Sequence, residues 1–338
     1  MTTGRAAWRA RVRSVAAGAR RLAASRLVRR PGLAGAEPEA RLDGWLSAYF
    51  DERLAPIDAA CAAGEPGFAM FRELDDEVWA MLLTRQYAGY PNIQARLPDV
   101  PDSGLQRNWT GTSGIALAAQ GAWFYRAVKA IYAEHGARGL VASRVLDFGC
   151  GWGRLTRFFA RDLEPGNLYG CDPVEDILEV CRRTRVPATL ARSEFLPQRL
   201  PFEERFDLVF AFSVFTHLSE TAHERCLRAI SAAQPAGGIL IVTIRPPAYL
   251  HHSELMRPIA GELGADPATA LRRPRYLFVP HPADPSHPQY EGGEMTYGEA
   301  VISLPYVRER WRDLYELREV RVALGDPYQI VLALRRTG

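Results

Sequence analysis

This 338-residue sequence has few long apolar runs, no closely paired cysteines and a single lysine. No stretch approaches the roughly 18 consecutive apolar residues that a membrane-spanning helix needs, so we expect no transmembrane segment. Its five cysteines are an odd number without close pairing, which predicts free thiols in a reducing cytoplasm. Neither a C-x-x-C nor a C-x-x-x-C-x-x-C spacing occurs, and iron–sulfur chemistry is therefore excluded.

Charge is unevenly distributed along the chain. Lys129 is the single lysine among 42 basic residues, and this arginine bias together with many alanines indicates a high-GC bacterial genome. Residues 1–36 hold nine arginines and no acid, so the rest of the chain, with 33 basic and 39 acidic residues, is mildly acidic. An acidic globular part gives no support for nucleic-acid binding.

The basic arm, residues 1–36, has two interpretations. Between residues 5 and 30, moderate apolar side chains recur at heptad-like spacing with arginines on the other faces: Trp8, Val12, Val15, Ala19 and Leu22. This pattern is typical of a basic amphipathic helix that touches an anionic membrane or an acidic partner. Five such residues bury little surface, however, and we favour a flexible or peripheral extension.

The most informative segment is Val145–Arg154, VLDFGCGWGR. An apolar run that predicts a buried strand leads into D-x-G-x-G-x-G, formed by Asp147, Gly149, Gly151 and Gly153, and a helical pattern follows. Glycines between a strand and a helix let the main chain approach a bound cofactor, because no Cβ blocks the contact. A dinucleotide fingerprint would need its third glycine at Arg154, and that glycine is missing.

This loop resembles the first motif of class I S-adenosylmethionine-dependent methyltransferases. The resemblance implies cofactor contacts from the loop, at Asp147, Gly149, Cys150, Gly151, Trp152 and Gly153. It also argues against a nicotinamide oxidoreductase on a related fold. We therefore expect S-adenosyl-L-methionine as the cofactor.

A carboxylate should follow the next strand. Asp172, before Pro173, stands 19 residues beyond Gly153 at the end of the segment NLYGCD. An acid at such a strand end can accept hydrogen bonds from both ribose hydroxyls. Taken alone it would more often be a helix cap, but coupled to the glycine loop it is predicted to contact the cofactor, with Pro173 beside it.

Further segments fit the same resemblance. Residues 206–212 form a nearly continuous apolar run, as expected of a central parallel strand, and residues 239–244 form another after a P-A-G-G turn. A helix is expected over residues 222–233. The resemblance adds Glu194, Phe212 and Ser213 to the cofactor contacts.

These elements predict a Rossmann-like, doubly wound α/β fold with a seven-stranded sheet and an antiparallel last strand. The methyltransferase domain is assigned to residues 137–338, and it closes with a helix over 304–314 and strands over 316–323 and 329–334. Residues 37–136 are helical by pattern and form an N-terminal extension or cap, with prolines 91, 98 and 101 interrupting the pattern.

The end of this extension resembles a bacterial methyltransferase subgroup that carries R-x-W-x-G-x-S-G and F-Y-R. Here the two elements read Arg107–Gly114 and Phe124–Arg126. Trp109 and Tyr125 are the residues that we take from them as candidate substrate contacts.

An insertion, residues 246–298, separates the fifth strand from the next recognisable element. It holds four of the chain's seven histidines, which are His251, His252, His281 and His287. Adjacent histidines project differently and no H-x-x-x-H or Cys/His spacing occurs, so no metal site is predicted. A loop of this length in a compact domain is usually a lid or a disordered insert, and we expect a lid over the substrate.

Methyl transfer from a sulfonium needs alignment and exclusion of water, and a hydroxyl acceptor also needs a base. His217 is the first candidate base because it follows the fourth strand, although a histidine there often only bonds main chain. His251 and His252 come next as substrate or base candidates, and Glu291 and Glu294 could anchor a polar acceptor.

Absent motifs narrow the acceptor. The segment after the fourth strand, Phe212–Phe215, lacks the [DN]-P-P-[YFW] of amino-methylating nucleic-acid enzymes, and no Pro-Cys pair exists for cytosine-C5 methylation. The sequence therefore predicts methylation of a small-molecule or glycan-type acceptor, mainly on oxygen. The alternative is a cofactor-binding, catalytically silent scaffold of the same fold.

Overall fold

The computed structural model describes residues 39–338 except 65–66, 86–88, 265 and 283–289. Contacts divide the chain into two compact units, Met1–Arg41 and Leu42–Gly338, and the whole sheet belongs to the second. The basic arm and His287 lie outside the described residues. Within the described part, no helix is long and apolar enough to cross a membrane.

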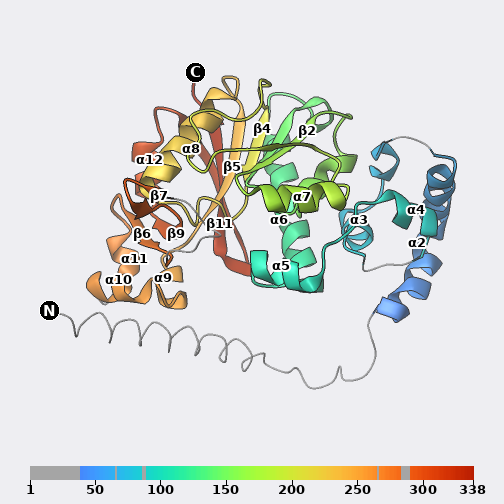
Figure 1. Ribbon diagram of the computed structural model, residues 1–338, viewed down its shortest axis with the longest axis horizontal. Helices are drawn as coiled ribbons and strands as arrows, with labels where there is room; N and C mark the ends of the chain where they lie inside the picture. Colours follow the sequence, from blue (N-terminus) through green and yellow to red (C-terminus); the bar gives the residue numbers. More distant parts are fainter. Residues whose placement is uncertain (1–38, 65–66, 86–88, 265, 283–289) are drawn as a thin grey trace. The chain divides into compact units, whose positions relative to one another are not determined.

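A seven-stranded sheet forms the centre of the second unit (Figure 1). Neighbouring strands among β3, β2, β1, β4 and β5 run parallel, while β11 is antiparallel to both β5 and β10. In spatial order the strands are β10 (Tyr315–Ala323), β11 (Asp326–Arg336), β5 (Ile239–Ile244), β4 (Leu208–Ala211), β1 (Val145–Phe148), β2 (Leu168–Asp172) and β3 (Thr189–Arg192). The predicted doubly wound sheet with an antiparallel last strand is confirmed.

Successive side chains of the central strands point to opposite faces of the sheet, and helices cover both. On one face Val145, Leu208 and Ile241 join a core with helices α3 (Asp76–Leu83) and α6 (Gly114–His135) and the 3₁₀ helix η3 (Thr156–Arg161). On the other face Leu146, Val209 and Leu240 pack with α8 (Glu220–Ala232) and α12 (Leu304–Arg310). Burial on both faces explains why these strands appear in the sequence as continuous apolar runs.

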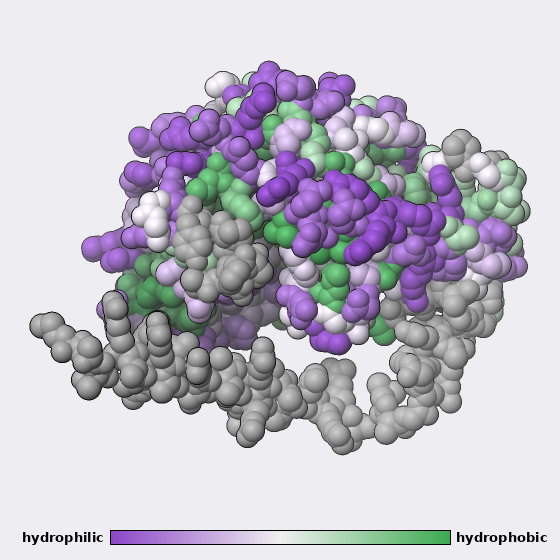
Figure 2. Space-filling model, viewed as in Figure 1, coloured by the Kyte–Doolittle hydropathy of each residue, from purple (hydrophilic) through white to green (hydrophobic). Residues whose placement is uncertain are grey.

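Helix α7 (Glu175–Arg183) is amphipathic, and its outer face makes a hydrophilic patch in the middle of the view (Figure 2). Ile177 and Val180 are buried with Trp152 and Leu117. The helix therefore packs its apolar face against the glycine loop.

Several elements differ from the sequence-based predictions. The segment after the glycine loop is a 3₁₀ helix, η3, rather than an α-helix, and α12 ends at Arg310 instead of 314. Strand β3 was not predicted. None of its four residues is fully buried, so its sequence shows neither a continuous apolar run nor an alternation of apolar and polar residues. Pro91 begins a helix rather than breaking one, since a proline is tolerated at the first helical position.

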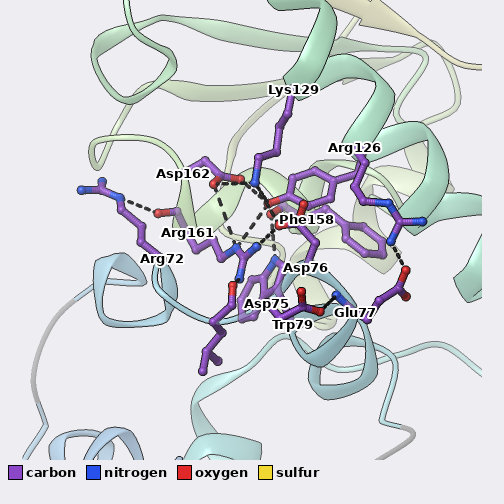
Figure 3. Close-up of polar contacts among 12 residues, drawn as sticks. Arg72, Asp75, Asp76, Glu77, Trp79, Arg126, Lys129, Phe158, Arg161 and Asp162 are labelled. Carbon is purple, nitrogen blue, oxygen red and sulfur yellow. Dashed lines mark hydrogen bonds and ion pairs between the residues drawn. The ribbon is translucent and has the colours of Figure 1, made fainter. Parts of the chain in front are cut away.

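The N-terminal extension consists of α2 (Glu39–Ala62), the 3₁₀ helix η1 (Ala69–Phe71), α3, α4 (Pro91–Arg96), α5 (Ser103–Thr110) and α6. Its attachment to the sheet centres on Arg161, of which 1% is exposed (Figure 3). The Arg161 guanidinium donates to the carbonyls of Phe71 and Leu74 at 3.1 and 2.7 Å and pairs with Asp76. The side chain therefore holds the start of α3 against η3.

Lys129 and Asp162, both labelled in Figure 3, complete this polar network together with Tyr125. The Tyr125 hydroxyl donates to Asp162 at 2.5 Å, and Lys129 lies 2.9 Å from Asp76 and 3.5 Å from Asp162. Burial is the main cause that raises the pKa of Tyr125. Tyr125, predicted as a substrate contact, is thus a structural residue of the core.

The insertion is folded, not a bare loop, over its described residues. It contains α9 (Tyr249–His252), α10 (Arg257–Glu262), α11 (Pro267–Ala270), β6 (Tyr276–Pro280), β7 (Tyr290–Glu291) and β8 (Glu294–Met295), and β9 (Gly298–Ile302) follows. Strands β6 and β9 pair antiparallel and apart from the main sheet. The sequence prediction missed this pair because prolines and glycines surround its short apolar runs.

Candidate active site

A cavity of about 710 Å³ opens at the carboxyl ends of the parallel strands. This edge is where open α/β sheets bind their ligands. Of the predicted site residues it is lined by Asp147, Gly149, Cys150, Gly151, Trp152, Asp172, Pro173, Glu194, Phe212, Ser213, His217, Trp109 and His252. The loop after β1, the end of β2, the segment after β4 and the insertion therefore converge on one space.

The three loop glycines have positive φ angles of 74°, 53° and 74°, which favour glycine, but they face different surroundings. A Cβ on Gly149 would lie 2.4 Å from Cγ2 of Val214, and a Cβ on Gly153 would lie 2.7 Å from Cγ2 of Val186. A Cβ on Gly151 would meet nothing closer than Trp109, at 3.8 Å. Of the three glycines, only Gly151 lines the cavity and also leaves room for a Cβ.

Gly153 is not among the residues that line the cavity. Its missing side chain lets the loop pack against Val186 and Cys181. Gly153 therefore has a packing role in the loop, and its contact with the cofactor stays a prediction.

Asp147 is 2% exposed and accepts a hydrogen bond of 2.6 Å from the Thr156 hydroxyl. Burial raises its pKa to about 7. Because Thr156 belongs to η3, this bond connects the end of β1 to the helix beyond the glycine loop.

Asp172 caps the same loop from β2. One carboxylate oxygen accepts from the Gly151 N–H and the other from the Val174 N–H, both at 3.0 Å. Burial raises the pKa of Asp172 to about 6 although these two bonds lower it. The carboxylate is therefore both a loop cap and a cavity-lining acceptor, because each oxygen can accept more than one hydrogen bond.

The side of the cavity next to the glycine loop also has an aromatic residue and an arginine. Trp109, 41% exposed, lies beside Gly151 from the end of α5. Arg154 donates to Gln120 of α6 at 2.8 Å and stacks over Phe212. Sequence reasoning missed Arg154 and Gln120, because only the packing of α6 on the loop brings them together.

His217 lines the cavity after β4. Its Nδ1 is 2.8 Å from the carbonyl oxygen of Gly298, which can only accept, so Nδ1 carries the proton and Nε2 the lone pair. Burial lowers its pKa to about 4 despite the opposing field of Glu299. At neutral pH His217 is an uncharged base held in one tautomer.

Four residues around His217 were not predicted as site residues. Its ring stacks on Tyr297 at 5.3 Å, and Glu299 lies 3.9 Å from its Nδ1 and 3.6 Å from Nε2 of His281. The other Glu299 oxygen accepts from the Tyr249 hydroxyl at 2.8 Å. The sequence marked none of these contacts because β9 comes more than 80 residues after β4.

His217, His281 and Glu299 each offer a ligand-type atom within 4.8 Å of the others. Protein partners already hold two of these groups, since His217 donates to Gly298 and Glu299 accepts from Tyr249. That no metal binds here stays a prediction.

Other candidates lie away from the cavity lining. His251 and His252 are both exposed on α9, but His251, unlike His252, does not line the cavity. Glu291 pairs with Arg225 of α8, and Glu294 is exposed. Neither glutamate is therefore placed to anchor an acceptor in this cavity.

Comparison with known proteins points to one family. Residues 145–238 match the family model described as a methyltransferase domain. A trans-aconitate 2-methyltransferase of Variovorax paradoxus is 28% identical over 140 residues, which are 41% of this chain and 53% of that protein. The chain thus spans about half the length of this relative.

Solved structures with low identity are similar as well. The magnesium protoporphyrin IX methyltransferase of Synechocystis PCC 6803 with bound SAH is 14% identical, with a TM-score of 0.46 over 69% of this chain and 94% of that one. A glycopeptide N-methyltransferase complexed with sinefungin is 15% identical, with a TM-score of 0.41 over 63% and 94%. The match over residues 145–238 identifies a methyltransferase domain there, and the order of the seven strands and the glycine loop beside Asp172 agree with it.

Proposed function

We propose that this protein transfers a methyl group from S-adenosylmethionine to a hydroxyl oxygen of a small-molecule or glycan-type acceptor. The observation that carries the proposal is one cavity with a cofactor end at Gly151 and Asp172 and a base, His217, in its wall. Catalysis of this kind requires both parts to border the same space.

The residues at the cofactor end fit a nucleoside with a methionine tail. Gly151 leaves room where a side chain would project, and the Asp172 carboxylate can accept from ribose hydroxyls while it caps the loop. Glu194 follows β3 on the same edge of the sheet. S-adenosylmethionine supplies a methyl carbon on a sulfonium, which is open to in-line displacement.

His217 is the proposed general base. Its Nδ1–H bond to Gly298 fixes the ring, and Nε2 is free to take the proton of an acceptor hydroxyl. Because its pKa is about 4, the ring is unprotonated at neutral pH, as a general base must be before the reaction. Glu299 stabilises the imidazolium that forms, since its carboxylate lies 3.9 Å from Nδ1.

The insertion provides the acceptor side of the cavity. His252 of α9 and His281 after β6 both line the cavity, and Tyr297, which also lines it, stacks on the ring of His217. We propose that this wall shields the reacting atoms from water, as a lid would. The name of the Variovorax relative, a trans-aconitate methyltransferase, supports a small soluble acceptor.

The test is a pair of measurements on the full chain. Calorimetry should show S-adenosylhomocysteine binding, and Gly151→Arg should weaken it at least tenfold, about 1.4 kcal/mol, by filling the open space. Incubation with S-adenosylmethionine and pooled small-molecule extracts should then form S-adenosylhomocysteine. Binding without turnover on any pool would support the silent scaffold, and NADH binding in place of S-adenosylhomocysteine would overturn the assignment.

A further inference from the structure

Arg245, the residue after β5, supplies a cation to the acceptor side of the cavity. Its guanidinium stacks on the Tyr249 ring at 4.1 Å, and Nη1 donates to the Tyr328 carbonyl at 3.3 Å. The planar group is thus fixed by one ring and one main-chain oxygen. Its Nε is buried and has no hydrogen-bond partner.

No carboxylate forms an ion pair with Arg245 among the residues that the structure describes. The two acids whose charges interact with it, Glu299 and Asp326, have other partners. Glu299 accepts from Tyr249 and faces the histidines, and Asp326 accepts from Gln120 at 2.6 Å. An unpaired cation with a buried, unsatisfied N–H is costly unless an anion meets it.

A second unsatisfied group lies on the neighbouring strand. The β5–β11 register ends at Ile244 opposite Ile330, and one step further it brings Gln329 opposite Arg245. Gln329 is 4% exposed and lines the cavity. Its Nε2 donates to the Ser213 hydroxyl at 3.1 Å, while Oε1 is buried without a partner.

We propose that Arg245 and Gln329 form a subsite for a small hydroxycarboxylate acceptor. The guanidinium binds the carboxylate of the acceptor, and the Gln329 amide oxygen accepts a hydrogen bond from a hydroxyl near that carboxylate. The subsite rests on the function proposed above, because it assigns the acceptor end of the same cavity. It makes Arg245 and Gln329 specificity residues, and His217 remains the base.

The surroundings favour a carboxylate over a phosphate. Arg245 is a single cation among aromatic rings, with Tyr249 beneath it and His252 stacked on Tyr328 at 4.1 Å. One guanidinium can match a planar monoanion through two parallel N–H bonds. A dianion would leave charge uncompensated in this wall.

The experiment uses the full chain saturated with S-adenosylhomocysteine. Calorimetric titrations compare two matched pairs, glucuronate with glucose and glycerate with glycerol, so that each pair differs in the carboxylate. We expect at least one acid to bind, with its neutral partner at least tenfold weaker. Arg245→Gln should weaken that acid at least tenfold, and the near-isosteric Gln329→Met about threefold to tenfold. Arg257→Gln, an exposed arginine on α10, is the control and should change nothing.

S-adenosylhomocysteine affinity in every variant reports whether the fold and the cofactor end are intact, and it should stay within twofold of wild type. Equal binding of acid and neutral partner, no binding of either acid, or an acid affinity unchanged in Arg245→Gln would overturn the subsite. If the variants fail to fold, the acid–neutral comparison in the wild-type protein still decides. If the wild-type protein does not bind S-adenosylhomocysteine at all, the proposed function itself is refuted, not only the subsite.

Discussion

The glycine loop allows a prediction that separates folding from ligand contact. Gly149→Ala and Gly151→Ala place the same methyl group at similar positive φ angles, 74° and 53°. The backbone cost of a left-handed conformation is therefore similar in both, about 1–2 kcal/mol. The two variants differ in what the new Cβ meets.

In Gly149→Ala the Cβ would lie 2.4 Å from Cγ2 of Val214, where carbon atoms prefer about 3.5–4.0 Å. Overpacking of this kind costs about 1–3 kcal/mol, so we expect a total loss of about 2–5 kcal/mol in unfolding free energy. In Gly151→Ala the Cβ meets only Trp109 at 3.8 Å, so stability should fall by about 1–2 kcal/mol. Cofactor affinity should nevertheless fall, because that methyl group projects into the cavity.

Urea unfolding without ligand and calorimetry with S-adenosylhomocysteine measure the two effects. The double variant Gly149→Ala/Val214→Ala provides the internal check, because the next atom, Cβ of Val214, is 3.6 Å away. On the Val214→Ala background, Gly149→Ala should cost only about 1–2 kcal/mol, a coupling of about 1–3 kcal/mol. Equal destabilisation on both backgrounds, or a Gly151→Ala protein as unstable as Gly149→Ala, would refute these roles for the two glycines.

The cavity and the buried core allow three more predictions. Asp172→Asn should weaken S-adenosylhomocysteine binding by one to two decades, about 1.5–3 kcal/mol. The wild-type affinity should fall as pH drops through about 6, where the Asp172 carboxyl protonates, and the variant should not show this pH dependence. His217→Ala should lower turnover by roughly two to four decades. At saturating S-adenosylmethionine, where the change in cofactor affinity near pH 6 does not limit the rate, the wild-type pH–rate profile should lose activity as pH falls through about 4, where Nε2 gains its proton. An acidic limb near 6.5 under these conditions would mean that His217 is solvated or is not the base. Arg161→Met should cost about 3–5 kcal/mol in urea unfolding, because it breaks the ion pair with Asp76 and leaves the buried carbonyls of Phe71 and Leu74 without their donor. Arg126→Met, which removes an exposed pair with Glu77, should cost less than about 1 kcal/mol.

The glycine loop and Asp172, which form the proposed cofactor end of the cavity, could be located from the sequence because their signals are local. The strands β1, β4 and β5 are continuous apolar runs, and the loop glycines sit at fixed offsets from β1. A short edge strand such as β3 has no such pattern. The residues around Glu194 therefore entered the prediction through resemblance to the family alone.

Tyr125 shows why motif residues need a structure. Its F-Y-R context resembles a subgroup motif, yet the hydroxyl bonds Asp162 and Arg161, which lie 37 and 36 residues away in the sequence. Arg161 in turn donates to the carbonyl of Phe71 in η1, 90 residues earlier in the sequence. A buried arginine that holds two layers together looks like any surface arginine in the sequence, because only its partners distinguish it.

The acceptor half lay beyond sequence reasoning for a related reason. The family match ends at residue 238, whereas Arg245, His281, Glu299 and Gln329 all come after it. The tautomer of His217 also depends on a residue beyond the family match, because the Gly298 carbonyl that bonds its Nδ1 is 81 residues away in the sequence. Proteins that bind the same cofactor can therefore have a similar glycine loop and still differ in the residues that surround the methyl acceptor. The methyl acceptor should be sought through the charges and hydrogen-bonding groups that follow β5, because these residues, not the glycine loop, line the proposed acceptor side of the cavity.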